Sequence, residues 1–145
     1  MSFGWINWIN IVAVVYLIVI NMIVAGKGLA DSFNSKHLAV NIFEQIGRYG
    51  CMVFMILPVF TDGWKFDFKS VPEMLIWAFT TILLLTCYII LWVKKERGGK
   101  GVLYGLAIVP VVLFLVNGVL LRHLALVVTS LIFGIFHLAI VRENV

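Results

Sequence analysis

The chain is 145 residues long, with 63% hydrophobic and only 12% charged residues. A soluble domain is about 45–50% apolar and about 25% charged, so these few charges cannot cover a water-facing surface. The composition therefore excludes a soluble globular domain, a disordered chain and a disulfide-stapled secreted domain. It predicts a single transmembrane domain that covers residues 1–145.

The formal net charge of +4 does not indicate a nucleic-acid partner. The basic residues flank apolar runs, where in membrane proteins they set orientation and attract anionic lipid head groups. Cys51 and Cys87 lie in different apolar runs and form no Cys-x-x-Cys pair, so they do not indicate a redox compartment. We therefore expect the lipid bilayer of a cell membrane (plasma or inner) as the surroundings, and no nucleic acid.

Five apolar runs are long enough to cross a bilayer core about 30 Å thick, which takes about 20 helical residues. In chain order these runs cover residues 5–25, 38–60, 72–93, 102–121 and 124–141. The last two are separated by Arg122 and His123 alone, which predicts a tight helical hairpin. The sequence thus predicts an all-α, polytopic integral membrane protein with five transmembrane helices.

The basic residues between the runs predict the orientation of the five helices. One side of the membrane would carry seven of them: Lys27, Lys36, Lys94, Lys95, Arg97, Lys100 and Arg142. The other side would carry three: Lys65, Lys69 and Arg122. Because the more basic side is normally cytoplasmic, we expect the N-terminus outside and the C-terminus in the cytoplasm. No Lys or Arg precedes Lys27, so we expect the first run to remain a span rather than act as a signal peptide.

The second run carries a polar face. Asn41, Glu44, Gln45 and Arg48 stand at i, i+3, i+4 and i+7, which places them on one side of a helix. Ionisable groups inside a membrane face a bundle interior or water, and they commonly mark ligand or ion pathways. We therefore expect this face to line a cavity open to the cytoplasm. The alternative is a structural ion pair between Glu44 and Arg48, which have the favourable i, i+4 order.

Two polar residues of other runs are expected at the depth of this face. Asn21 lies near the inner end of the first run, and His137 lies near the inner end of the last. Both are candidates for the same cavity, and His137 beside Glu44 could titrate near neutral pH. Equal depth does not require contact, however, and a histidine near a helix end is commonly a hydrogen-bonded interface group.

Small and polar residues also predict contacts between the helices. Gly47 and Gly50 flank the polar face, and Gly101 and Gly105 form a Gly-x-x-x-Gly pair, so each pair is expected to let helices approach closely. Asn117 lies inside the fourth run and is expected to hydrogen-bond to another helix.

Several kinds of chemistry have no support in the sequence. No run holds histidines or cysteines at metal-ligand spacing, and no Gly-x-Ser-x-Gly or phosphate-binding loop is present. The sequence therefore predicts no catalytic residues, no metal and no cofactor, and it favours a non-enzymatic protein.

Two functions from different classes remain, and a membrane-embedded enzyme that acts on lipid, with a glutamate–histidine pair as acid and base, ranks third. The first is binding or transport of a small molecule or ion in a cytoplasm-facing cavity, by a homo-oligomer. The candidate ligand-binding residues are Asn21, Asn41, Glu44, Gln45, Arg48 and His137. The second is a non-catalytic accessory or assembly subunit, in which the polar face contacts a membrane-protein partner.

Overall fold

The computed structural model describes residues 2–4, 7–26, 35–57, 66–95 and 97–144. These residues form five helices and two short strands, which confirms the all-α prediction. The helices are α1 (Trp8–Gly26), α2 (Leu38–Ile56), α3 (Val71–Lys94), α4 (Lys100–Leu120) and α5 (Leu124–Asn144). The strands β1 (Ser2–Gly4) and β2 (Phe66–Asp67) pair antiparallel and link the start of the chain to the approach to α3.

Three of the described helices, α3, α4 and α5, are long and apolar enough to cross a membrane. The apolar part of α1 is shorter and covers Trp8–Ile23. Helix α2 has 19 residues and carries Glu44 and Arg48 within them. The structure thus supports a helical membrane protein with three candidate membrane-spanning helices. That α1 and α2 also span the membrane is part of the function proposed below.

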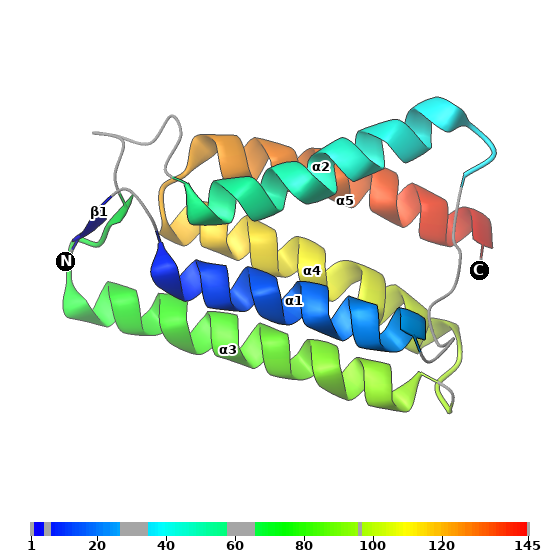
Figure 1. Cartoon of the computed structure of the whole chain (residues 1–145), viewed down its shortest axis with the longest axis horizontal. Helices are drawn as coiled ribbons and strands as arrows, with labels where there is room; N and C mark the ends of the chain where they lie inside the picture. The colour runs from blue at the N-terminus through cyan, green and yellow to red at the C-terminus, as the bar shows by residue number, and fades with distance from the viewer. Residues whose placement is uncertain (1, 5–6, 27–34, 58–65, 96, 145) are drawn as a thin grey trace.

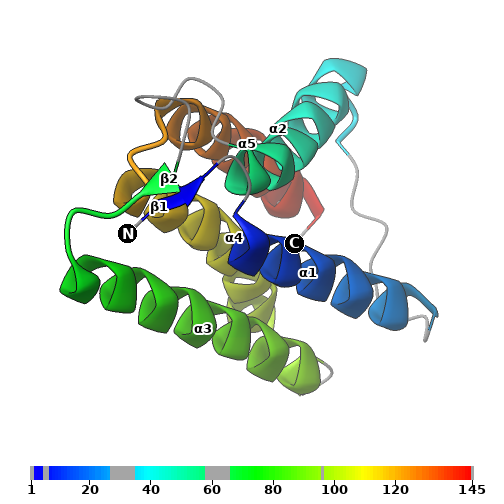
Figure 2. The ribbon, with the colours of Figure 1, turned by 60° about the vertical axis from the view of Figure 1, so that its left-hand side comes forward.

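The helices pack side by side in the order α2, α5, α4, α3, and α1 lies against α2 and α3 (Figures 1 and 2). Glycines allow the closest approaches. A Cβ atom on Gly47 of α2 would lie 2.8 Å from the Cα atom of Phe133 in α5. A Cβ atom on Gly118 of α4 would lie 2.9 Å from the backbone nitrogen of Val127. The prediction for Gly47 is therefore confirmed, whereas an added Cβ on Gly101 would have no neighbour within 4 Å in the described part of the chain.

Helix α2 ends at Ile56, whereas the predicted span continues to residue 60. The next residue, Leu57, has extended backbone angles, φ −111° and ψ 133°. In the sequence Leu57 precedes Pro58, and a residue before proline is sterically driven out of the helical region. The last carbonyl groups of α2 consequently need donors from elsewhere in the chain.

Three donors from distant parts of the chain bind these carbonyl groups. The Asn10 side-chain amide donates to Met55 O at 2.9 Å. The backbone N–H of Asn7 donates to Ile56 O at 3.0 Å. The Nε2 atom of His123 donates to Leu57 O at 2.9 Å. We call these contacts the carbonyl clamp, and the end of the bundle that contains them the closed end.

A buried amide joins three helices at the closed end. The Oδ1 atom of Asn117 accepts from Trp77 Nε1 at 2.7 Å and from Asn10 Nδ2 at 3.3 Å. Asn117 lies in α4, Trp77 in α3 and Asn10 in α1, and all three are fully buried. The predicted hydrogen bond from Asn117 to another helix is therefore confirmed. Asn7 adds a helix cap, because its side-chain oxygen accepts from the backbone N–H of Asn10 at 3.0 Å.

The connection between α4 and α5 is a tight turn, as predicted. The backbone N–H of His123 donates to Gly118 O at 2.8 Å, and that of Arg122 donates to Val119 O at 3.2 Å. This is the Schellman pattern, and its left-handed position, usually a glycine, is occupied by Arg122 with φ 52°. The Arg122 side chain forms an ion pair with Glu73 of α3.

Candidate functional site

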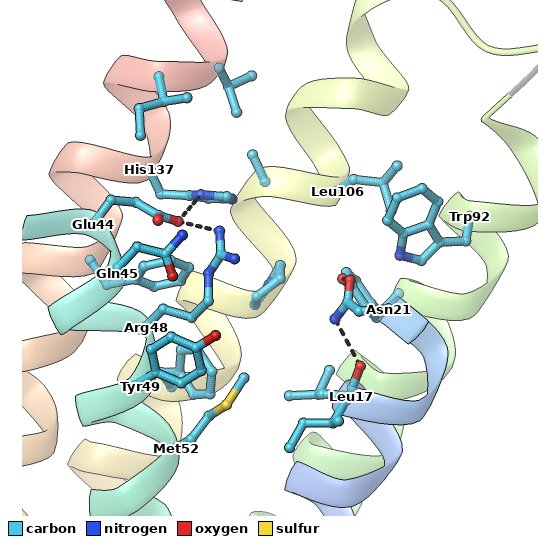
Figure 3. Close-up of a pocket in the computed structure, with 18 of the residues that line it drawn as sticks. Leu17, Asn21, Glu44, Gln45, Arg48, Tyr49, Met52, Trp92, Leu106 and His137 are labelled. Carbon is cyan, nitrogen blue, oxygen red and sulfur yellow. Dashed lines mark hydrogen bonds and ion pairs between the residues drawn. The ribbon is translucent and has the colours of Figure 1, made fainter. Parts of the chain in front are cut away.

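A cavity of about 680 Å³ lies at the other end of the bundle. Figure 3 shows α2 and α5 on one side of it, with α1 and α3 on the opposite side. Residues from all five helices line this cavity. They include every residue that the sequence analysis selected: Asn21, Asn41, Glu44, Gln45, Arg48 and His137.

Glu44 is the central charged group of the cavity. Its side chain is 3% exposed, and its Oε1 atom accepts hydrogen bonds from both Arg48 and His137. The His137 Nδ1 atom donates across 2.9 Å from α5, whereas Arg48 lies one turn further along α2. The structure therefore joins His137, for which the sequence predicted only equal depth, to the Glu44–Arg48 pair that the helix spacing had indicated.

Helix packing explains how Glu44 reaches His137. Gly47 allows α2 to lie directly on the backbone of α5 at Phe133, one helical turn from both residues. The ring of Phe133 stacks on the His137 imidazole, with 4.7 Å between centroids and an interplanar angle of 26°. The Arg48 guanidinium carbon lies 5.9 Å from the centroid of the same ring. Phe133 thus supports both donors that bind Glu44.

The opposite side of the cavity is formed by residues of α1 and α3. The Tyr88 hydroxyl donates to Asn21 Oδ1 at 3.1 Å, and Asn21 Nδ2 donates to Leu17 O at 2.8 Å. The Trp92 Nε1 atom is buried and has no hydrogen-bond partner among the described residues. The Lys95 ammonium, at the end of α3, lies 4.9 Å from the centroid of the Trp92 ring.

Sequence reasoning missed Trp92, and it assigned Lys95 to membrane orientation and the attraction of anionic lipid head groups rather than to the cavity. Lys95 directly follows the last residue of α3, so its proximity to the cavity follows from where the helix ends. The orientation of the Trp92 indole is a matter of side-chain packing, which gives no periodic signal in the sequence.

Two of the predicted residues, Asn41 and Gln45, lie outside the hydrogen bonds that hold Glu44. The Asn41 side chain is engaged by Ser35, whose backbone N–H donates to Asn41 Oδ1 at 2.8 Å and whose carbonyl oxygen accepts from Asn41 Nδ2 at 3.0 Å. Ser35 in turn donates its hydroxyl to Glu143 near the end of α5, at 3.0 Å. Asn41 therefore braces the start of α2. Gln45 is exposed and has no hydrogen-bond partner within the described residues.

The remainder of the cavity wall is largely apolar. Its apolar residues come from four helices, α1, α2, α4 and α5. They are Leu17, Ile18, Met22, Met52, Leu103, Leu106, Ala107, Pro110, Phe114, Phe133, Ile140 and Val141. A cavity that is mostly apolar, with a few convergent polar groups, has the usual character of a ligand site.

Within the described ranges, no group of three or more His, Cys, Asp or Glu residues could hold a metal ion. Comparisons with known proteins give no further guidance, since no family model, curated protein or solved structure matches this chain. The described residues define a small helical bundle with three membrane-length apolar helices and a cavity lined by charged, polar and mainly apolar side chains.

Proposed function

We propose that this protein is an integral membrane protein that binds or transports a small molecule or ion in the cavity around Glu44. The observation that carries the proposal is the buried Glu44 carboxylate, which is held by Arg48 and His137 at the edge of a cavity of about 680 Å³. In this role Arg48 would hold an anionic group, or Glu44 would exchange a proton.

The cost of placing charges in a membrane supports this proposal. A charged side chain at the centre of a membrane helix costs about 2.5–3.5 kcal/mol on insertion scales. A structural ion pair would account for Glu44 and Arg48 but would not require a cavity beside them. The cavity also contains Asn21 and Gln45, and the latter has no partner among the described residues.

The proposed topology places all five helices in the plasma or inner membrane, with the C-terminus in the cytoplasm. The cavity lies where α3 ends and α4 begins, next to the basic residues Lys94, Lys95, Arg97 and Lys100. Because such residues are enriched on the cytoplasmic side, the cavity would open toward the cytoplasm. Homo-oligomerisation is part of the same proposal, since five helices alone enclose a small cavity rather than a wide pore.

Ligand-induced thermal stabilisation of the purified protein tests this function. The protein would be screened against inorganic ions and metabolites as the wild type and as the Glu44→Gln and Arg48→Ala variants. We expect at least one compound to raise the unfolding temperature of the wild type, and this response to disappear in both variants.

The ion pair of Glu73 and Arg122 provides the matched control, because it joins helices at the closed end and lies outside the cavity. Glu73→Gln and Arg122→Ala should retain the full response. A response that survives Glu44→Gln and Arg48→Ala would refute the site. Co-purification of another membrane protein, weakened by these two variants but not by the controls, would instead favour the accessory-subunit function.

A further inference from the structure

We infer that the ligand of this cavity is an anionic amphiphile, an acyl-chain lipid with a phosphate or carboxylate head group, which enters sideways between α1 and α2. The inference rests on the proposed function and names the class of ligand for the same site. Four properties of the cavity carry it: size, charge, an unused donor and the position of the opening.

The size of the cavity exceeds what an inorganic ion needs. Its volume is about 680 Å³. One water molecule takes up about 30 Å³ of liquid, and pockets for drug-sized molecules measure about 300–1,000 Å³. Apolar residues such as Leu17, Leu106 and Phe114 form much of the wall, so most of the volume suits hydrocarbon rather than hydrated charge.

Two cationic side chains and one acidic side chain line the cavity. Arg48 and Lys95 are cationic, and Glu44 is the acidic residue among the lining side chains. Arg48 binds Glu44 through its Nη2 atom, and a guanidinium carries five N–H donors in all. Its side chain is 36% exposed, so the remaining donors can reach a second anionic group.

The indole of Trp92 offers a further donor. Its Nε1 atom is buried and lacks a hydrogen-bond partner within the described part of the chain. A buried N–H without an acceptor costs free energy, which an acceptor oxygen on the ligand would recover. Figure 3 shows Trp92 across the cavity from Arg48, on the same side as Asn21. A head group with several oxygens, such as a phosphate, suits donors on both sides.

We place a side opening of the cavity between α1 and α2, in addition to the opening toward the cytoplasm proposed above. Helices α1 and α2 are joined at the closed end, where Asn7 and Asn10 bind the last carbonyl groups of α2, and they diverge toward the cavity (Figures 1 and 2). The cavity-lining side chains Met22 and Tyr49 are 67% and 61% exposed. Since α1 and α2 are proposed to lie in the membrane, this opening faces lipid, which favours a ligand that partitions into the bilayer.

Quenching of tryptophan fluorescence by brominated lipids tests the inference. The full chain would be reconstituted in nanodiscs of phosphatidylcholine, with increasing fractions of phosphatidylglycerol whose acyl chains carry bromine. Phosphatidylcholine with the same brominated chains is the neutral arm, and inorganic phosphate in a thermal-shift measurement is the soluble arm. The Trp92→Phe variant isolates the signal of the cavity from that of the other tryptophans.

We expect the anionic brominated lipid to quench the Trp92 signal saturably, and the neutral lipid to quench it far less at the same fraction. Lys95→Gln should weaken the apparent affinity about five-fold, the effect of one basic residue near an anionic lipid surface. Lys94→Gln is the matched control, because Lys94 precedes Lys95 and does not line the cavity. Lys95→Gln leaves the Glu44 contacts intact, so it avoids the folding risk of an Arg48 variant.

Equal quenching by the two brominated lipids, or equal effects of Lys95→Gln and Lys94→Gln, would overturn the inference. If inorganic phosphate or a soluble metabolite stabilised the protein through Glu44 and Arg48 while neither lipid quenched Trp92, the lipid inference would fail and the proposed function would stand. If neither a soluble compound nor a lipid gave a response dependent on Glu44 or Arg48, both would fail.

Discussion

The two ends of the bundle use polar residues in opposite ways. At the closed end, short neutral side chains such as Asn10 and Asn117 are fully buried and bind backbone carbonyl groups and one another. At the cavity end, longer charged side chains such as Arg48 and Lys95 stand around open space. A polar residue in an apolar helix is therefore not by itself a sign of a site. What distinguishes the cavity end is the presence of charged side chains beside open space.

The largest expected effect tests whether the closed end holds the bundle together. Asn117→Leu removes the acceptor of Trp77 and Asn10, and it also removes the donor to Leu113 O. We expect a loss of about 2–3 kcal/mol in the free energy of unfolding, measured by chemical denaturation in detergent.

Thr86→Val is the control for this change. The Thr86 hydroxyl donates to Ile82 O of its own helix, so its removal should cost less than about 0.5 kcal/mol. The ligand response of the Asn117 variant should persist, because Asn117 does not line the cavity. Equal losses in the two variants would contradict the division between a closed end and a cavity end.

The next effect concerns the contact that brings Glu44 to His137. Gly47→Ala would place a Cβ atom 2.8 Å from the backbone of Phe133, so α2 must move away from α5. We expect a loss of about 1–3 kcal/mol in the free energy of unfolding, together with a weaker ligand response. Gly101→Ala is the matched control, because its added Cβ atom would meet no described residue within 4 Å, and it should be neutral or slightly stabilising. If the Gly47 variant were as stable as the wild type, α2 and α5 could separate without cost, and the close contact at Gly47 would not be required.

The smallest effect is a pH dependence at the closed end. Burial lowers the pKa of His123 below its ordinary value of 6.5. Its Nδ1 atom accepts from the backbone N–H of Leu126 at 3.3 Å, so protonation of Nδ1 would break that contact. The unfolded chain binds a proton near pH 6.5, before the folded protein does. The stability contributed by neutral His123 is therefore complete above pH 6.5 and is lost as the pH falls toward the folded pKa.

Unfolding temperatures between pH 5 and pH 7.5 measure this dependence. We expect His123→Gln to have a flatter profile than the wild type, because glutamine does not titrate. The difference between the two profiles isolates the contribution of His123. Parallel profiles would show that His123 does not contribute to the pH dependence.

The sequence predicted the helices, and periodicity and depth selected six of the residues that line the cavity. The i, i+3, i+4, i+7 spacing selected Glu44 and Arg48, and equal distance from the inner helix ends selected His137 and Asn21. The end of α2 at Ile56 was also available from the sequence, since Pro58 disfavours helical geometry at Leu57. The predicted span continued past it because the residues that follow are apolar.

The closed end was largely missed, although part of it has a local signal. Asn7 and Asn10 lie three residues apart at the start of α1, where an asparagine commonly caps a helix. Both residues were instead included in the first apolar run. The divergence of α1 from α2 has no such signal, and neither has the Trp92 N–H, which lacks a hydrogen-bond partner among the described residues. Both depend on how helices cross and which rotamers they allow, which are properties of packing in three dimensions.

The carbonyl clamp has a consequence for the order in which the protein assembles. Chains are synthesised from the N-terminus, and α2 is complete long before His123, which follows Leu57 by 66 residues. Asn7 and Asn10 precede α2 and can bind Ile56 and Met55 as soon as α2 forms. The carbonyl of Leu57 must await the α4–α5 turn, so the final hairpin completes a helix end made much earlier. The last hairpin thus completes both ends of the bundle, since its turn supplies His123 to Leu57 and α5 supplies His137 to Glu44.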